Sequence, residues 1–152
     1  MQNDFYTSTE VSQITGCSRR QLQYWRDKGV VVPTVNPSGK GRNVYYSVKE
    51  LVALTVMNYL LSLGLSFELS VNILQMLRER EAWMFTESLQ QLNYKQWMIR
   101  LSLEDYSPEL LDVDAAKSNM VLETISDGGI ICLDSHKIYA LLNRRLGNSK
   151  YF

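Results

Sequence analysis

A short basic segment, CSRRQLQYWRDKG at residues 17–29, carries the side chains with the clearest chemical use. Guanidinium and ammonium groups bind phosphate oxygens, and on a helix in the major groove they also reach base edges. A basic helix taken alone is also typical of a solvated surface, so the neighbouring segments decide between the two interpretations. The segment has one acid, Asp27, and its basic residues are Arg19, Arg20, Arg26 and Lys28.

Capping signals place this segment on the second of two short helices. Ser18 is a typical N-cap, because its hydroxyl can accept a hydrogen bond from a free backbone N–H, and Gly29 is a typical stop. Upstream, Thr7 and Glu10 have the spacing of a capping box, which predicts a first helix. A turn that contains Gly16 joins the two, as in a helix-turn-helix unit whose second helix enters the major groove.

Helical spacing gives the second helix two different sides. Leu22 points to one side and Trp25 leans toward it, whereas Arg20 and Tyr24 project from roughly the opposite side, one turn apart. This pattern predicts an apolar anchor on one side and an Arg/Tyr face on the other. Cys17, in the turn before the helix, is expected to be a small apolar filler and not a redox thiol.

A second basic segment follows the helix. Residues 30–32 are three valines, residues 36–43 are rich in turn formers, and residues 44–46 return as β-type sequence. This pattern predicts a two-stranded hairpin, which is either an ordinary surface hairpin or a wing that lays Lys40 and Arg42 against phosphates. Because the segment follows a basic helix, we favour the wing. Such contacts provide affinity and salt dependence and not sequence choice.

The charge of the chain is unevenly distributed. The net charge of the 152 residues is zero, yet residues 17–49 hold seven Lys and Arg against one acid, and residues 81–152 hold seven against ten acids. Only the front of the chain is therefore expected to meet an anion. The apolar content of 45% is that of a folded protein. Two distant cysteines, Cys17 and Cys132, indicate neither a disulfide framework nor a metal cluster.

Two further helices are expected after the hairpin. Ser47 and Glu50 have capping-box spacing, and the apolar helix that they open is closed by Gly64. Ser66 then caps a helix in which leucine and isoleucine recur at helical spacing up to Leu77. These apolar residues are interpreted as core and not as a cofactor site.

The order of these features over roughly residues 5–78 resembles the DNA-binding domain of the MerR family of transcription regulators. The most specific parts are SRRQLQYWRDKG, the basic wing, and YYS with an acid three residues after the serine. The resemblance implies that Arg20, Tyr24 and Trp25 contact DNA. Val44 stands where the family normally has a wing arginine, so that role is assigned to Arg42 or Lys40. The expected DNA-contact residues are Ser18, Arg19, Arg20, Gln21, Gln23, Tyr24, Trp25, Lys40, Arg42 and Tyr45.

The second half departs from that family, whose members typically dimerise through one long antiparallel coiled-coil helix. Residues 79–93 could start such a helix, but Trp97 to Leu103 then alternate as in a strand, and Ser107-Pro108 breaks the chain. Further predictions are a strand from Met120 to Ile125, a hairpin turn at Asp127-Gly128-Gly129, a strand from Ile130 to Leu133, and a final helix that Asp134 or Ser135 caps and Gly147 follows.

The expected fold is therefore α+β, with two parts. Residues 1–79 are predicted to form a winged helix-turn-helix, and residues 80–152 a small module of helices and antiparallel sheet. Catalysis is not expected, because His136 is the only histidine and the acids Glu104, Asp105, Asp112 and Asp114 are more typical of a solvated surface. No cofactor, metal or membrane partner is expected, no apolar run is long enough to span a membrane, and the expected location is cytoplasmic.

The expected function is that of a dimeric repressor. Exposed sheet edges in the second half can pair with a second copy, so two recognition helices would bind an inverted repeat in double-stranded promoter DNA and occlude polymerase. Ligand-switched activation is disfavoured, because the second half shows neither thiolate metal ligands nor a sequence signature of a drug-sized pocket. Length and the departure from the family also resemble the short MerR-type repressors of type V-K CRISPR-associated transposons.

Two other classes of protein remain open. One is an excisionase-like recombination accessory factor, which uses a similar winged fold to bend DNA and binds at an element end. The other is a MerR-like modulator that binds a protein and has no affinity for DNA. The net charge of +6 over residues 17–49 favours DNA binding over the second alternative.

Overall fold

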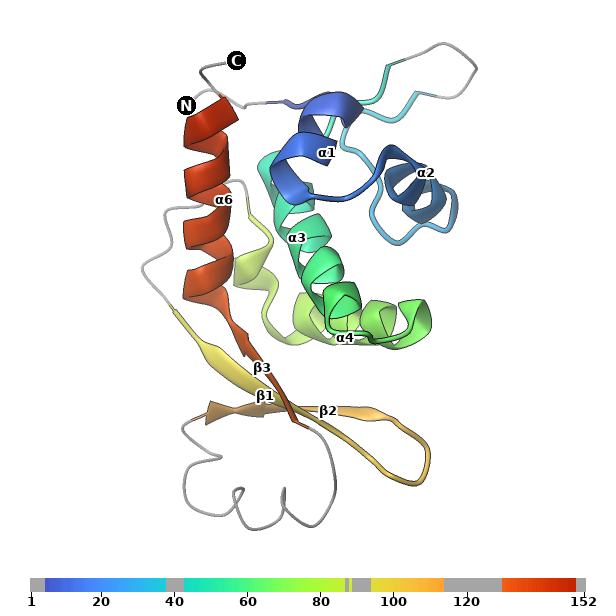
Figure 1. Cartoon of the computed structure of the whole chain (residues 1–152), viewed down its shortest axis with the longest axis vertical. Helices are drawn as coiled ribbons and strands as arrows, with labels where there is room; N and C mark the ends of the chain where they lie inside the picture. Colours follow the sequence, from blue (N-terminus) through green and yellow to red (C-terminus); the bar gives the residue numbers. More distant parts are fainter. Residues whose placement is uncertain (1–4, 38–42, 87, 89–93, 114–129, 150–152) are drawn as a thin grey trace.

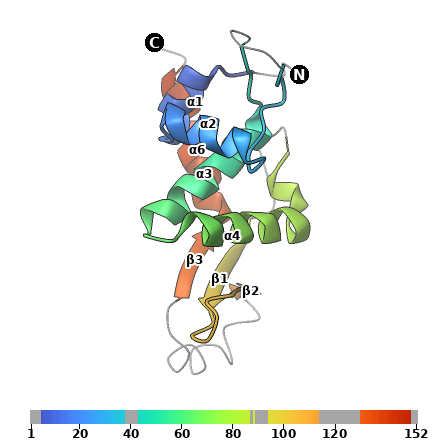
Figure 2. The same ribbon diagram turned by 90° about the vertical axis from the view of Figure 1, so that its right-hand side faces the viewer.

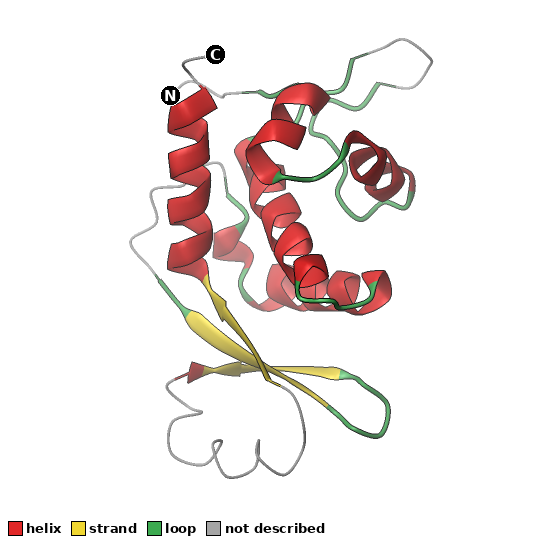
Figure 3. Cartoon of the chain, in the orientation of Figure 1, coloured by secondary structure: helices red, strands yellow, loops and turns green. Residues whose placement is uncertain are grey.

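The computed structural model shows an α+β protein, with helices above a small antiparallel sheet (Figures 1 and 3). The residues that it describes are 5–37, 43–86, 88, 94–113 and 130–149. Among these residues the elements, in chain order, are α1 (Ser8–Thr15), α2 (Arg19–Asp27), α3 (Val48–Ser62), α4 (Phe67–Arg80), the short 3-10 helix η1 (Ala82–Met84), β1 (Gln96–Leu101), β2 (Pro108–Asp112), β3 (Ile130–Asp134) and α6 (Ser135–Ser149).

The predicted helix-turn-helix is confirmed, with the capping residues in their expected places. Thr7 and Glu10 form a capping box at the start of α1. Ser18 Oγ accepts a hydrogen bond from the Gln21 amide at 3.0 Å, and the Gln21 side chain accepts one from the Ser18 amide at 2.9 Å. Gly29 has a φ of +71° directly after α2, a conformation that L side chains rarely adopt. Local capping chemistry therefore sets the length of both helices.

The predicted two-stranded hairpin is present only as isolated bridges. Val35 pairs with Tyr45, and Tyr46 pairs with Tyr6, which precedes α1. The base of the wing is thus held to the helix-turn-helix through backbone hydrogen bonds at Tyr6, of 2.9 Å in both directions. Residues 38–42, the expected tip, lie outside the described residues.

The valine run at residues 30–32 is not the first strand of that hairpin, contrary to the prediction, because its backbone serves the end of α2. The amides of Val30 and Val31 donate to the carbonyl oxygen of Trp25 at 2.8 and 3.4 Å. The Val30 carbonyl oxygen in turn accepts a 2.7 Å hydrogen bond from Arg78 of α4. Backbone groups that satisfy a helix end are no longer available for a strand ladder.

The predicted capping box at Ser47 and Glu50 is wrong. Ser47 makes no side-chain cap hydrogen bond, and its hydroxyl instead joins that of Thr34 in donating to the Glu50 carboxylate. Arg78 lies near enough for the Glu50 charge to act on it; burial lowers the pKa of Arg78, and Glu50 opposes that change. This polar cluster holds the segment after α2 against both α3 and α4.

The helix expected over residues 79–93 does not form in the described part of that range, because α4 ends at Arg80 and η1 follows. Glu81, at the junction, turns its carboxylate inward and is almost fully buried. It accepts hydrogen bonds from Lys95 Nζ at 2.7 Å, from the Trp83 indole at 2.7 Å and from the Trp97 indole at 3.2 Å. A buried carboxylate with three donors fixes the chain reversal from α4 into the sheet.

The sheet has the strand order β2-β1-β3, and both pairs are antiparallel. The strand predicted from alternation is confirmed as β1, but it ends at Leu101 and not at Leu103. The expected break at Ser107-Pro108 is wrong, because β2 begins at Pro108. Proline is tolerated there since it is the first residue of an edge strand. Trp97 lies opposite Leu133 in β3, and both side chains are buried.

Helix α6 joins the two halves of the chain. It begins after Asp134, whose Oδ1 accepts a 2.9 Å hydrogen bond from the His136 amide, and it continues to Ser149 through Gly147, where the sequence predicted its end. The helix packs against α3 and α1, and Tyr139 and Leu142 enter the core shared with the helix-turn-helix. The predicted strand at residues 120–125 and turn at 127–129 lie outside the described residues.

One hydrophobic core spans the described residues of both halves (Figures 1 and 2). In both views α4 lies between the helix-turn-helix and the sheet, and it contacts β2 through a 2.6 Å hydrogen bond from Arg80 to the Leu110 carbonyl oxygen. The expected division at residue 79 falls within the last turn of α4. In the part of the chain that is described, no helix combines the length and the apolar character needed to cross a membrane.

Candidate nucleic-acid interface

Helix α2 presents basic and aromatic side chains to solvent and anchors its other side in the core. Arg19, Arg20 and Tyr24 are exposed, Tyr24 at 47%, whereas Leu22 and Trp25 are each 2% exposed. Within the described residues, neither Arg19 nor Arg20 has a hydrogen bond or an ion pair. The two guanidinium groups are thus available to an outside anion, while the buried pair fixes how the helix is turned.

Trp25 does not belong to this exposed face. The resemblance implied a DNA contact for Trp25, but its side chain is among the largest that are fully buried, and its carbonyl oxygen receives the amides that follow α2. The apolar spacing with Leu22, which made Trp25 lean toward the core side, is the signal that the structure follows. We therefore remove Trp25 from the contact set and assign it to the support of α2.

Tyr24 extends the exposed face from α2 onto the start of α4. Its ring lies 5.2 Å from that of Phe67, centroid to centroid, at an angle of 57°. The Lys28 ammonium lies 5.7 Å from the centroid of the Tyr24 ring on the same side of the helix. Arg20, Tyr24 and Lys28 thus follow one another at i+4 spacing, with an aromatic body between two positive charges.

Arg26 holds the wing against α2 and is not free to reach outward. Its Nε donates to Asn36 Oδ1 at 2.7 Å, and its NH2 group donates to the Pro37 carbonyl oxygen at 3.4 Å. Asn36 and Pro37 are the last described residues before the tip of the wing. The distance between the recognition helix and the wing is therefore set by a side chain that the sequence suggested only as one more positive charge.

Comparisons with known proteins bear on this part of the chain. Residues 6–77 match the family described as MerR HTH family regulatory protein. Residues 6–77 are a MerR-type helix-turn-helix domain. The match covers α1 to α4, including every described residue of the exposed face.

Curated relatives share only this domain. A stretch of 62 residues is 36% identical to uncharacterized HTH-type transcriptional regulators of Mycobacterium bovis and of two strains of Mycobacterium tuberculosis. The stretch is 40% of this chain and 28% of each relative, so the chain spans less than a third of their length. These matches leave the sheet and α6 without a curated counterpart among the relatives named here.

The other expected contact residues of the MerR-type domain have differing surroundings. Ser18 and Gln21 use their side chains to cap α2, and Gln23 Nε2 donates to Asp27 at 2.9 Å. Tyr45 is half-buried in the wing base, where its amide and carbonyl pair with Val35. Lys40 and Arg42 lie outside the described residues, so their assignment to phosphate contacts stays a prediction.

Sequence reasoning missed two parts of this interface. Phe67 was treated only as the beginning of a helix, and Asn36 only as a turn former. The i+4 series of Arg20, Tyr24 and Lys28 could have been found on a helical wheel, because it needs no tertiary information. The pairing of Arg26 with Asn36 could not, since it depends on how the chain returns after Gly29.

Two side chains with possible chemistry are accounted for by packing. Cys17 is buried, its thiol donates to the Leu54 carbonyl oxygen at 3.6 Å, and burial raises its pKa to about 11. A thiol of this kind is unreactive at neutral pH, as expected of a filler residue. His136 is exposed in the first turn of α6, with the Tyr94 ring 4.4 Å away in an edge arrangement. No cluster of metal-ligating side chains occurs among the described residues.

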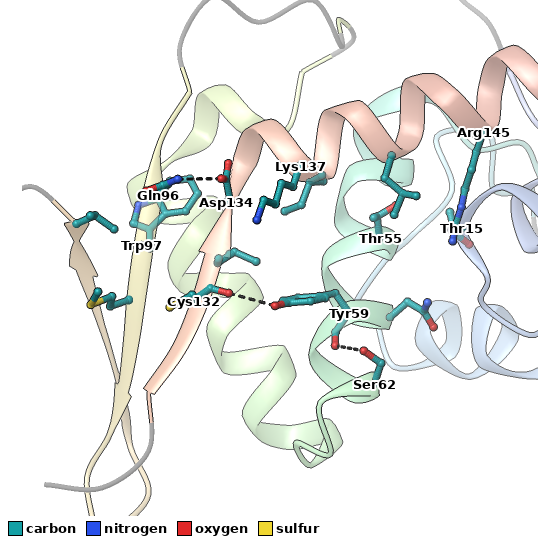
Figure 4. Close-up of a pocket in the computed structure, with 16 residues that line it drawn as sticks. Thr15, Thr55, Tyr59, Ser62, Gln96, Trp97, Cys132, Asp134, Lys137 and Arg145 are labelled. Carbon is teal, nitrogen blue, oxygen red and sulfur yellow. Dashed lines mark hydrogen bonds between the residues drawn. The ribbon is translucent and has the colours of Figure 1, made fainter. Parts of the chain in front are cut away.

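The C-terminal half contributes to a cavity that its sequence did not signal. The cavity has a volume of about 560 Å³ and lies between α3, α6 and the strands β1 and β3 (Figure 4). Four polar residues of α3 face it at helical spacing, namely Thr55, Asn58, Tyr59 and Ser62. The expectation that this half lacks a drug-sized pocket is therefore corrected.

Proposed function

We propose that the chain is a sequence-specific DNA-binding transcription regulator whose α2 lies in the major groove. The observation that carries the proposal is the exposure of Arg19, Arg20 and Tyr24 on a short helix whose opposite side is locked by Leu22 and Trp25. Recognition needs side chains held in a defined direction, and a helix with a buried anchor supplies that. The MerR-type match over residues 6–77 supports the same function.

The positive charge of the domain supports binding to the phosphate backbone beside the groove. Residues 17–49 carry a net charge of +6, and Lys28 stands at the exposed end of α2. We propose that Lys40 and Arg42 reach phosphates from the wing, which Arg26 holds beside the recognition helix. Phosphate contacts of this kind fix register and orientation, whereas Arg20 is the residue that we expect to read base edges.

We further propose a homodimer that represses by occlusion. The support is the surface of the C-terminal half, where Leu103 and Tyr106 are 65% and 68% exposed on the turn between β1 and β2. Large exposed apolar side chains on an edge hairpin favour association with another copy. A dimer with two-fold symmetry would place two recognition helices on an inverted repeat, and a promoter covered in this way excludes polymerase.

The experiment is a selection of bound sequences from a pool of random duplexes, followed by fluorescence anisotropy on the selected site. We expect an inverted repeat, and loss of about 1–3 kcal/mol of binding free energy in Arg20→Ala if the residue reaches a base. Arg144→Ala is the matched control, because Arg144 is exposed on α6 away from α2. Equal losses in the two variants would contradict the proposed interface.

The same measurements distinguish the two alternatives and the closer kinship. Bound sites at the ends of a mobile element, with DNA bending, would favour an excisionase-like accessory factor. Absence of any affinity for duplex DNA at low salt would favour a MerR-like protein-binding modulator. Sites in a promoter next to genes of a type V-K CRISPR-associated transposon would support the repressor of such an element.

A further inference from the structure

The cavity between the MerR-type domain and the sheet has walls of different chemistry. Side chains of β1, β3 and α6 give it a largely apolar lining, to which Trp97, Leu133, Ile138 and Leu141 contribute. The wall formed by α3 supplies hydroxyl and amide groups from Thr55 to Ser62. An enclosed apolar space of drug-like size with a few convergent polar groups is typical of a small-molecule site.

The charged groups of the cavity are mostly cationic. Lys137 and Arg145 both line it from α6, two turns apart, with Leu141 between them. Figure 4 shows Lys137 extending toward the space between α6 and β3. In the part of the chain that is described, no acid pairs with Lys137. The cavity therefore complements a ligand that has an apolar body and a negative charge.

The single acid of the lining does not oppose this assignment. Asp134 Oδ2 accepts a 2.9 Å hydrogen bond from Gln96, and its Oδ1 caps the first turn of α6. Both oxygens are thus engaged before a ligand arrives. A positively charged ligand would find a carboxylate that is already satisfied and two basic side chains that repel it.

Arg145 connects the cavity to the helix-turn-helix. Its NH1 group donates a 2.9 Å hydrogen bond to the carbonyl oxygen of Ile14, in the last turn of α1, and Figure 4 shows the side chain pointing toward Thr15. A positive charge is favourable at that position, because unsatisfied carbonyl groups make a helix C-terminus negative. The residues that follow, Gly16 and Cys17, lead directly into the Ser18 cap of α2.

We propose that this cavity binds an amphipathic organic anion, such as a carboxylate on an apolar body, and that the anion draws Arg145 from Ile14 and so changes the affinity of α2 for DNA. The second clause rests on the proposed function; the first does not. A ligand can shift this equilibrium only through different contacts in the two states, and the Arg145 guanidinium is the group that would exchange its partner.

Binding is tested first, without DNA, on the full chain. Anilinonaphthalene sulfonate serves as the fluorescent probe, and decanoate, decanol and decyltrimethylammonium compete with it below their micellar concentrations. We expect decanoate to displace the dye at about tenfold lower concentration than decanol, and the cation to be weakest. Lys137→Met should weaken decanoate about tenfold and leave decanol unchanged, whereas Arg144→Met should change neither.

A filling variant gives the cavity a test that does not depend on charge. Leu141→Trp should abolish dye binding, and its urea midpoint shows whether the variant still folds. Equal displacement by all three competitors, or unchanged dye binding in a folded Leu141→Trp, would overturn the site. A dye signal that falls as the protein concentration rises would also overturn it, by assigning the cavity to a second copy of the chain.

Coupling is tested last, by anisotropy on the selected operator with and without decanoate. We expect the DNA affinity to change at least about threefold in the wild type and not in Arg145→Met. Decanoate binding without any change in DNA affinity would overturn the coupling and keep the site. Absence of DNA binding in every condition would instead contradict the proposed function, while the dye measurements would still decide whether the cavity binds anions.

Discussion

Arg26 of α2 and Asn36 of the wing are joined by a 2.7 Å hydrogen bond from Nε to Oδ1. The bond spans the gap between the two parts that are proposed to grip DNA, so its role is positioning. Arg26→Met and Asn36→Ala should each weaken operator binding by about 1 kcal/mol, as expected for the loss of one hydrogen bond. Fluorescence anisotropy on the selected operator measures both losses.

The double variant decides whether the two residues act as a unit. If the bond positions the wing, Arg26→Met combined with Asn36→Ala should lose little more than either single variant. Simple addition of the two losses would mean that Arg26 contacts DNA by itself. Gln23→Met is the matched control, because its bond to Asp27 stays within α2 and does not reach the wing.

Tyr24 and Trp25 are adjacent aromatic residues with opposite surroundings, 47% and 2% exposed. Trp25→Ala should lower the free energy of unfolding by about 3–5 kcal/mol, because it empties a large buried site. Tyr24→Ala should change stability by less than about 1 kcal/mol and reduce DNA affinity instead. Urea denaturation and anisotropy on both variants separate the effects. A stable Trp25→Ala protein with impaired DNA binding would restore Trp25 as a contact residue.

The wing prediction concerns Arg42 and Lys40. If Arg42 touches a phosphate, Arg42→Ala should weaken binding about equally on all duplexes and make the slope of log affinity against log salt shallower by about 1. Titrations at several salt concentrations, on the operator and on an unrelated duplex, measure the slope. A loss confined to the operator would assign Arg42 to base recognition. Lys49→Ala, on the exposed side of α3, serves as a charge-matched control.

The helix-turn-helix could be predicted from the sequence because its signals are local. Ser18 and Ser66 need only their own helix turns to act as caps, and Gly29 needs only its own φ. The Ser47 cap failed for the opposite reason. Thr34, thirteen residues upstream, brings a hydroxyl to the Glu50 carboxylate, and a contact at that distance leaves no trace in the capping pattern.

The C-terminal half was less predictable because its pairing is long-range. Alternation marked β1, but its partner Ile130–Asp134 lies about thirty residues further along the chain, and Pro108 concealed β2. The cavity left a weaker signal in the polar series from Thr55 to Ser62 on an otherwise apolar helix. That spacing shows which side of α3 is not core, but only the fold shows that α6 and β3 stand opposite it.

Glu81 gives the last prediction, on the pH dependence of stability. Burial alone would raise the pKa of its carboxyl, but hydrogen bonds from Lys95, Trp83 and Trp97 outweigh burial and leave the pKa below the ordinary value of 4.5. A group with a lowered pKa in the folded state stabilises the fold above its unfolded pKa, and this contribution is lost as the pH falls through the folded value. The contribution of Glu81 should therefore be complete at pH 7 and lost below about pH 4.5.

The variant Glu81→Gln isolates that contribution. At pH 7 its free energy of unfolding should be lower than that of the wild type by about 2 kcal/mol, because three donors lose a charged acceptor. The difference should shrink as the pH is lowered below 4.5, where the wild-type carboxyl becomes protonated as well. Glu109→Gln is the control, since Glu109 pairs with Arg100 at the sheet surface and is half-exposed. Urea midpoints at pH 7 and at low pH provide the measurement, and a difference between wild type and Glu81→Gln that stays constant with pH would contradict the role of the Glu81 charge.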